Sequence, residues 1–141
     1  MKRTGVIYWS GGGNTEAMAN AVLEGMKSAG AEAVILTPDA VDAALMSGLE
    51  AIAFGCPAMG AEVLEEAEFE PMFAEFKGAL GGKKVALFGS YGWGDGEWMR
   101  NWEADCEDQG INLICDSVIC CEAPDDDALQ ACKAMGAKLA E

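Results

Sequence analysis

Short apolar runs alternate with amphipathic runs along the whole chain, and the two patterns predict two kinds of element. Apolar runs of strand length predict five strands, over Thr4–Trp9, Glu32–Leu36, Ala51–Gly55, Lys84–Ser90 and Asn112–Cys120. Apolar residues at helical spacing predict five helices, over Asn14–Ala29, Val41–Ser47, a segment ending near Lys77, Glu97–Gln109 and Asp126–Leu139. Strands that alternate with helices, without repeats or linkers, are typical of a parallel sheet covered on both faces.

The chain length agrees with a single α/β domain over residues 1–141 that has a core of its own. We predict a doubly wound, five-stranded parallel sheet in the order 2-1-3-4-5, which is a common order for such a domain. In that order the ligand crevice lies outside the carboxyl ends of strands 1 and 3, where the strand order reverses. The loops after strands 1, 3 and 4 are therefore expected to meet at one ligand site.

The loop after the first predicted strand has the composition of a phosphate-binding loop. It consists of Ser10-Gly11-Gly12-Gly13-Asn14-Thr15 and leads directly into a helix. Glycines let the backbone approach phosphate oxygens, the amides of the helix start point at them, and Ser10, Asn14 and Thr15 add side-chain donors. No lysine follows the glycines, and the spacing differs from that of the dinucleotide-binding fingerprint. The loop thus suits a phosphate with no metal beside it, although a plain tight turn would use the same glycines.

Two further loops supply groups that suit a flat ligand. Tyr91 and Trp93 stand among glycines after the fourth strand, and a ring held beside a crevice can stack on a planar ligand. After the third strand, Met59 offers a soft apolar contact for the opposite face. Gly60 permits the positive φ of a type II′ turn, and Glu62 can accept a hydrogen bond. With the phosphate loop, these residues predict a site for FMN. The alternatives remain that Tyr91 and Trp93 pack on their own loop, that Met59 lies in the core and that Glu62 is a solvated carboxylate.

The charge balance narrows the possible partners. The chain has 24 acidic and 9 basic residues, which give a formal net charge of −15. This charge argues against nucleic acid and anionic membranes and favours basic protein partners, although it would also serve solubility alone. No apolar run approaches the ~18 residues of a membrane span, and the N-terminus enters a strand without a signal peptide. We therefore expect a cytoplasmic chain.

The sequence has no histidine and six cysteines. The lack of histidine removes the commonest general base and metal ligand, which argues against most hydrolase and zinc mechanisms. The cysteines form no C-x-x-C pair, and their spacing matches neither a zinc site nor an iron–sulfur site. We expect no metal and mostly buried, reduced thiols, with the adjacent Cys120 and Cys121 as a pair that could ligate or oxidise.

Several motifs together resemble those of flavodoxins, specifically the short-chain flavodoxins of anaerobic bacteria. They are the segments Val6–Gly11, Gly13–Glu16, Gly55–Gly60, Glu65–Pro71 and Phe88–Met99. The resemblance covers nearly the whole chain and weakens over Thr37–Ser47 and in the last strand and helix. It implies a flavodoxin-like fold, FMN bound tightly without a covalent bond, and transfer of one electron at a time between redox enzymes.

Carried over by position, the resemblance implies a role for each loop. Ser10–Thr15 would hold the phosphate, and Met59 and Trp93 would flank the isoalloxazine ring. Glu62 would bond the N3 edge of the ring, and backbone amides of Tyr91–Gly94 would meet its pyrimidine carbonyls. The candidate cofactor-binding residues are, in full, Ser10, Gly11, Gly12, Gly13, Asn14, Thr15, Pro57, Ala58, Met59, Gly60, Ala61, Glu62, Ser90, Tyr91, Gly92, Trp93, Gly94 and Asp95.

The resemblance also assigns a redox role to one peptide. The Gly60-Ala61 peptide would turn its carbonyl toward flavin N5 on reduction and so stabilise the neutral semiquinone. Two positions depart from the family pattern, because Gly12 stands where the family has Thr and Ala61 where related sequences often have a polar residue. The hydroxyl missing at Gly12 is expected to weaken FMN binding about tenfold, at roughly 1.5 kcal/mol for a charge-assisted hydrogen bond. The Cys120–Glu122 region matches poorly and is expected to make no contact.

The function predicted is that of a monomeric, low-potential one-electron carrier, not an enzyme, that cycles mainly between flavin semiquinone and hydroquinone. An uncompensated phosphate and an acidic surface that includes Glu62, Glu65 and Glu66 both disfavour the anionic hydroquinone. A small FMN-dependent NAD(P)H or quinone reductase is the alternative, although so short a chain has no insertion to build a second pocket. A response-regulator receiver is rejected, because it needs an Asp at the end of strand 3, where Gly55-Cys56-Pro57 stands. A flavin-free interaction module remains open.

Overall fold

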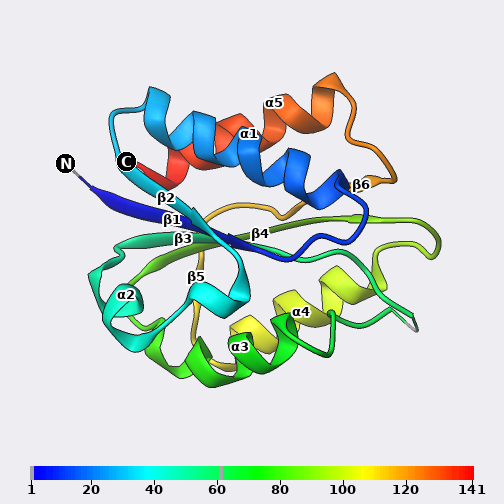
Figure 1. Cartoon of the computed structure of the whole chain (residues 1–141), viewed down its shortest axis with the longest axis horizontal. Coiled ribbons are helices and arrows are strands. Elements are labelled where there is room, and N and C mark those ends of the chain that lie inside the picture. Colours follow the sequence, from blue (N-terminus) through cyan, green and yellow to red (C-terminus); the bar gives the residue numbers. More distant parts are fainter. Residues whose placement is uncertain (1, 61) are drawn as a thin grey trace.

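The computed structural model describes residues 2–60 and 62–141. Within them, all strands belong to one parallel sheet in the order β2-β1-β3-β4-β5, and β6 also pairs with β4 (Figure 1). The strands are β1 Arg3–Tyr8, β2 Glu32–Leu36, β3 Ala51–Gly55, β4 Lys84–Tyr91, β5 Asn112–Leu113 and β6 Val118–Cys121. The predicted α/β class, the parallel pairing and the strand order are confirmed.

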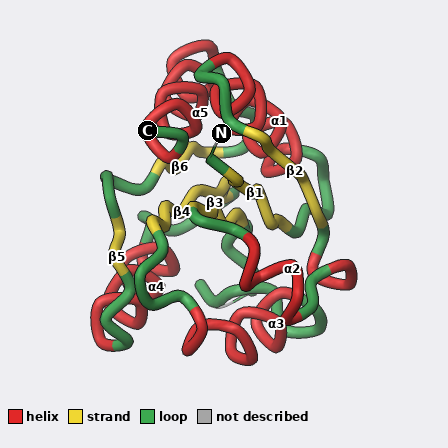
Figure 2. The backbone as a smooth tube through the Cα atoms, turned by 90° about the vertical axis from the view of Figure 1, so that its left-hand side faces the viewer, coloured by secondary structure: helices red, strands yellow, loops and turns green. Residues whose placement is uncertain are grey.

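Helices cover both faces of the sheet. α1 and α5 lie side by side on one face, and α2, α3 and α4 lie on the other (Figures 1 and 2). The helices are α1 Asn14–Ser28, α2 Ala43–Gly48, α3 Phe69–Phe76, α4 Glu97–Asp108 and α5 Asp126–Leu139, with short 3-10 turns η1 Pro38–Ala40 and η2 Lys77–Ala79. The predicted second helix starts later than expected, because the Asp42 side chain accepts a 2.8 Å hydrogen bond from Leu45 N and caps α2 there.

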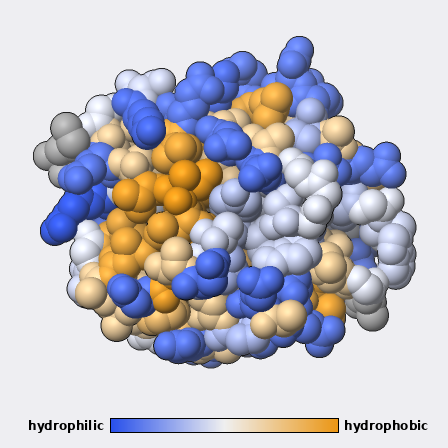
Figure 3. All heavy atoms as spheres, in the orientation of Figure 1, coloured by the Kyte–Doolittle hydropathy of each residue, from blue (hydrophilic) through white to orange (hydrophobic). Residues whose placement is uncertain are grey.

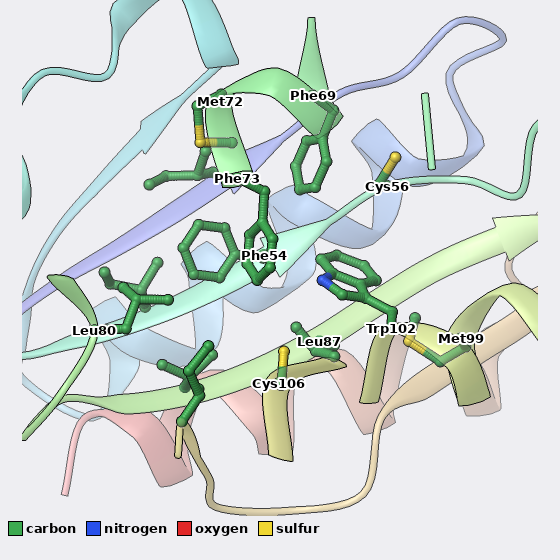
Figure 4. Packing of buried hydrophobic residues seen from close by; sticks show 14 of the residues in the cluster. Phe54, Cys56, Phe69, Met72, Phe73, Leu80, Leu87, Met99, Trp102 and Cys106 are labelled. Carbon is green, nitrogen blue, oxygen red and sulfur yellow. The ribbon is translucent and has the colours of Figure 1, made fainter. Parts of the chain in front are cut away.

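Aromatic side chains fill the space between β3 and the helices α3 and α4. Phe54 of β3 packs edge-on against Phe73, with ring centroids 5.1 Å apart (Figure 4). Trp102 of α4 makes an edge-on contact with Phe69 at 5.4 Å. Aromatic pairs of this geometry contribute about 0.5–1.5 kcal/mol each beyond the area they bury. The first pair joins α3 to the sheet and the second joins α4 to α3, so α4 and the loop from which it starts are held through α3.

Two glycines bring the backbones of α1 and α5 into contact. A side chain at Gly25 would collide with the carbonyl oxygen of Lys133, and a side chain at Gly136 would collide with that of Val22. Close approach of this kind excludes any Cβ at the crossing. It fixes the position of α1, whose N-terminus follows the predicted phosphate loop.

The predicted fifth strand is divided, which corrects the expectation of one continuous strand over Asn112–Cys120. Val85 of β4 pairs with Leu113, but Phe88 pairs with Val118, so the fifth strand carries two extra residues between the two pairings. The Ser117 side chain leaves the ladder there and donates a 2.6 Å hydrogen bond to Glu103 of α4. Such an insertion bends a strand and re-aims the residues beyond it, here β6 and the segment that follows.

Hydrophobic side chains gather on the surface over β2 and α2 (Figure 3). Val34 of β2 is 38% exposed there, and Leu36 and Leu45 are partly buried beside it. This area lies at the β2 edge of the sheet, away from the three loops predicted to bind a ligand. Among the described residues, no helix has the length and apolar character needed to cross a membrane.

The six cysteines are free thiols. Cys56, Cys106 and Cys132 are buried, and burial raises the pKa of each of these thiols to about 12. The expectation of buried, reduced thiols is therefore confirmed for these three, whereas Cys120 is partly buried and Cys121 is exposed. Within residues 2–60 and 62–141, no group of His, Cys, Asp or Glu side chains could hold a metal ion.

Candidate functional site

The carboxyl ends of β1, β3 and β4 lie side by side, as the predicted order requires. Tyr8 pairs with Gly55, and Gly55 pairs with Phe88. Backbone hydrogen bonds continue past the ladder, from Trp9 N to the Gly55 oxygen at 3.0 Å and from Ala58 N to the Ser90 oxygen at 3.1 Å. The three loops after these strands therefore converge, which confirms the arrangement expected from the sequence.

A hollow of about 140 Å³ opens between these loops. Its lining comprises Ser10, Gly11, Gly12, Asn14, Thr15, Pro57, Ala58, Ser90, Tyr91, Gly92 and Glu122. All but Glu122 belong to the set predicted from the sequence. The remaining described members of that set, among them Met59, Glu62, Trp93 and Asp95, lie outside this lining.

The glycine loop is held in shape by Ser10. The Ser10 Oγ accepts hydrogen bonds from Gly13 N at 3.1 Å and from Glu16 N at 3.3 Å. Gly13 has φ 95° and precedes α1 but has no side chain with which to cap the helix. Ser10 supplies the capping oxygen in its place. The amides of Asn14 and Thr15 belong to the first helical turn, where N–H groups have no partner within the helix. They are free to face an anion.

The Thr15 hydroxyl is an unsatisfied hydrogen-bonding group in the lining of the hollow. The side chain is only 1% exposed, and its Oγ1 has no hydrogen-bond partner. A buried polar group left without a partner costs about 1–3 kcal/mol. Thr15 therefore fits a ligand oxygen at the start of α1, and Gly12 beside it has open space where a Cβ would stand. The donor set of this loop fits a phosphate group.

The loop after β3 forms a small hairpin. Met59 and Val63 exchange backbone hydrogen bonds of 2.9 and 3.0 Å. Gly60 has φ 47°, which confirms the predicted positive φ, but the bonded pair encloses three residues and not the two of a type II′ turn. Glu62 also has a left-handed φ, of 60°. The predicted contacts of Ala61 and of the Gly60-Ala61 peptide lie outside the described residues.

The loop after β4 presents one free aromatic ring and one anchored ring. Trp93 is 66% exposed, as expected for a side chain that a ligand would cover. Tyr91 is partly buried and packs on the core residue Trp98, with ring centroids 5.5 Å apart. The Asp95 carboxylate bonds Arg100 at 2.9 Å, and this hydrogen bond holds the pKa of Asp95 below its usual value. The Asp95 carboxylate is thus already paired with Arg100 of α4.

Glu122 is a wall residue that the sequence analysis missed. The Cys120–Glu122 region was expected to make no contact, yet Glu122 lines the hollow. Its backbone has φ 59°, and its amide donates a 2.7 Å hydrogen bond to the Tyr91 oxygen. A left-handed glutamate leaves no signal in the sequence, since glycine and asparagine are the residues normally expected there. Only its position after the last strand could have pointed to it.

Glu65 is not part of the acidic surface, which corrects a further expectation. Its side chain is 6% exposed, and its carboxylate accepts hydrogen bonds from Ala67 N, Glu68 N and Phe69 N at 2.8–2.9 Å. Burial alone would raise the pKa of Glu65, but the three backbone donors outweigh it and lower the pKa. Glu65 is therefore a buried residue that caps the start of α3.

Carboxylates line a second hollow, of about 420 Å³, that adjoins the glycine loop. Tyr8 Oη donates a 3.0 Å hydrogen bond to Glu16, and Trp9 Nε1 donates a 3.4 Å bond to Glu68. Burial and the bond to Glu16 raise the pKa of Tyr8. Neither hollow has a lysine or arginine in its lining. Among the described residues, the electrostatic surroundings of the glycine loop are therefore negative.

A doubly wound sheet with a phosphate-type glycine loop and an exposed aromatic loop at one edge places the chain among the α/β nucleotide-binding proteins. The family model described as flavodoxin matches residues 6–136. The chain is 44% identical over 131 residues to the flavodoxin of Megasphaera elsdenii, which covers 93% of each chain. It is 42% identical to the flavodoxin of Clostridium beijerinckii, over 96% of this chain and 97% of that one. The solution structure of two-electron reduced Megasphaera elsdenii flavodoxin is similar with a TM-score of 0.89, over 97% of this chain and 98% of that chain.

The chain therefore belongs to the flavodoxin family, as its motifs indicated. Flavodoxins are FMN-binding electron carriers that deliver electrons to redox enzymes and are not themselves enzymes. The predicted family, fold, cofactor and function are confirmed at this level, and the alternative of a reductase is not favoured.

Proposed function

We propose that residues 1–141 form a single flavodoxin domain that binds FMN at the smaller hollow and carries one electron at a time at low potential. The observation that carries this proposal is the Thr15 hydroxyl, which is buried beside the glycine loop without a partner. A phosphate oxygen would accept its hydrogen bond. When bound, FMN supplies a ring that takes up and releases electrons singly.

The segment Ser10–Thr15 would hold the phosphate with its backbone amides and with three side chains. Ser10 Oγ accepts two amide bonds and keeps its own proton to donate. No basic residue lines either hollow, so the phosphate would retain its charge. One unit charge ~12 Å from the ring at an effective ε of ~20 costs ~1.4 kcal/mol. This repulsion disfavours added negative charge on the ring, which supports a low potential.

The ring would lie between the loops after β3 and β4. Trp93 and Met59 would enclose it, and the exposed Trp93 would lose much of its contact with water. Glu62 would accept a hydrogen bond from the N3 edge through its Oε1, which is buried without a partner. Backbone amides of Tyr91–Gly94 would face the pyrimidine carbonyls, and Pro57, Ala58, Gly60, Ser90 and Asp95 would complete the surrounding backbone.

The partners would be basic-faced redox proteins, both as electron donors and as acceptors. The net charge of −15 supports this assignment, because opposite charge speeds the encounter of two proteins. The same charge disfavours nucleic acid and anionic membranes. We further propose that the protein acts as a monomer in the cytoplasm, where such partners are met by diffusion.

Titration of the apoprotein with FMN and with riboflavin tests the proposed site. Binding quenches flavin fluorescence, so both affinities follow from one type of experiment. We expect FMN to bind at least about a hundredfold more tightly, since two charge-assisted hydrogen bonds at ~1.5 kcal/mol each exceed that factor. Equal affinities would show that the glycine loop does not hold the phosphate. No binding of either flavin would support a flavin-free interaction module.

A further inference from the structure

Helix α4 is capped from a distant loop. The helix begins at Glu97, directly after Gly96, which has φ 93° and no side chain with which to cap. The Glu97 amide donates a 3.0 Å hydrogen bond to Oε2 of Glu62, which lies 35 residues earlier in the loop after β3. The first amides of a helix need an acceptor from outside the helix, and a carboxylate is favoured there by the helix dipole.

The two loops fit closely around this carboxylate. Glu62 adopts φ 60°, a left-handed conformation that is unfavourable for a residue with a Cβ. Gly94, at φ 89°, faces it, and a Cβ on Gly94 would collide with the carboxylate group of Glu62. A strained backbone at one position and a required glycine at the other indicate that the structure is built to bring Glu62 to the start of α4.

The second carboxylate oxygen remains free. Oε1 of Glu62 is buried and has no hydrogen-bond partner. One oxygen thus serves the helix, while the other is left without a donor. Asp95 is the competing acceptor, because its carboxylate also interacts with the Glu97 amide, but its strongest bond runs to Arg100 at 2.9 Å.

We propose that Glu62 is a positioning residue that caps α4 and so holds the loop Tyr91–Gly96 in its ligand-ready shape before any flavin is present. The ligand part of this role rests on the proposed function, whereas the capping does not. In the apoprotein, Oε2 fixes the start of α4 and the preceding loop. When FMN binds, Oε1 meets the ring edge without a rearrangement of that loop.

The apoprotein provides the first test, through hydrogen exchange of the Glu97 amide measured by NMR and through urea unfolding. We expect Glu62→Ala to speed exchange of that amide and to lower the folding equilibrium constant about fivefold, which is the size of a lost helix cap. Glu62→Gln should keep most of the protection, because its amide oxygen can still accept the bond. Glu66→Ala, which removes an exposed charge from the same segment, is the matched control and should leave both readouts unchanged.

Two results would overturn the capping. One is unchanged exchange of the Glu97 amide in Glu62→Ala. The other is faster exchange of that amide in Asp95→Ala but not in Glu62→Ala, which would make Asp95 the cap.

FMN titration of the same variants provides the second test. If Glu62 prepares the loop, FMN affinity should fall in the order in which protection of the Glu97 amide falls, from wild type through Glu62→Gln to Glu62→Ala. Much weaker FMN binding in a Glu62→Gln variant that keeps this protection would mean that Glu62 acts on the flavin directly and not through the loop. If Glu62→Ala leaves the Glu97 amide fully protected while the wild-type protein binds FMN, this inference fails and the proposed function stands. If Glu62 protects the Glu97 amide but the wild-type protein binds no FMN, the capping stands and the proposed function fails.

Discussion

The hydroxyl group of Ser90 donates a 2.6 Å hydrogen bond to the carbonyl oxygen of Glu122 and so joins the end of β4 to the segment after β6. The Glu122 amide returns a 2.7 Å bond to the Tyr91 oxygen. These two bonds close one side of the hollow. They also stabilise Glu122 in its left-handed conformation, which would otherwise be unfavourable.

Ser90→Ala should destabilise the apoprotein by about 1 kcal/mol. Ser90 is 4% exposed, and loss of its hydroxyl leaves the Glu122 oxygen with only the weak thiol donor Cys120, at 3.6 Å. Urea unfolding measures the change, and Ser28→Ala, at an exposed position near the end of α1, is the control that should stay within about 0.5 kcal/mol of wild type. An equal effect of the two substitutions would mean that the Ser90 bond contributes nothing specific.

Thr15→Val should change apoprotein stability and FMN affinity in opposite directions. The valine keeps the shape of the side chain but removes the buried hydroxyl without a partner, so the apoprotein should be as stable as wild type or more stable by up to about 1 kcal/mol. FMN should bind about tenfold more weakly, because one charge-assisted bond to the phosphate is lost. Riboflavin, which lacks the phosphate, should bind equally to both proteins. A parallel loss for both flavins would place Thr15 away from the phosphate.

Gly12→Thr should tighten FMN binding about tenfold, because it adds a hydroxyl where the loop lacks one. The structure accommodates the change, since nothing lies within 4 Å of a Cβ at Gly12 and its φ is not left-handed. Gly13→Thr is the matched control. It places a β-branched residue at φ 95°, and should lower stability and FMN affinity together. FMN affinity unchanged in Gly12→Thr would mean that water or the backbone already supplies the missing bond.

Glu65 should contribute stability that depends on pH. Its pKa is lowered in the folded protein by three backbone donors, so the folded state favours the charged form. The contribution is therefore complete above the usual carboxyl value of 4.5 and is lost as the pH falls through the lowered pKa. We expect Glu65→Gln to cost about 1.5 kcal/mol at pH 7, from hydrogen bonds to a charged acceptor.

The difference between wild type and Glu65→Gln, measured by urea unfolding, should shrink steadily below pH 4.5. Glu66→Gln, at an exposed position next in the chain, is the control and should stay within about 0.5 kcal/mol of wild type at pH 7. A cost of Glu65→Gln that stays constant down to low pH would contradict the assignment of Glu65 as a charged cap.

The sequence was sufficient for the fold because strand-length apolar runs alternate with helix-length amphipathic segments. The central strand β3 Ala51–Gly55 is apolar throughout and fully buried, and both β3 and β2 Glu32–Leu36 begin and end where predicted. The convergence of the three loops followed from strand order alone. The division of the last strand could not be foreseen, since the two extra residues between Leu113 and Val118 carry no pattern of their own.

Several glutamates have roles that depend on tertiary contacts, and two of them, Glu65 and Glu122, were predicted wrongly. Glu65 and Glu66 are neighbours of the same type, yet one caps α3 and the other is exposed. Glu62 reaches an amide 35 residues away, and Glu122 takes a backbone conformation that its side chain does not favour. A carboxylate in a chain with 24 acidic residues carries no local sign of such a role.

Stepwise anaerobic reduction of the FMN-loaded protein, followed by its visible spectrum, tests the central claim most directly. A one-electron carrier should pass through a distinct species with long-wavelength absorbance, which grows during the first electron equivalent and fades during the second. The potential of the second step should be the lower one, because the phosphate and the surrounding carboxylates disfavour added negative charge. Bleaching in a single two-electron step, with no such species, would contradict the account.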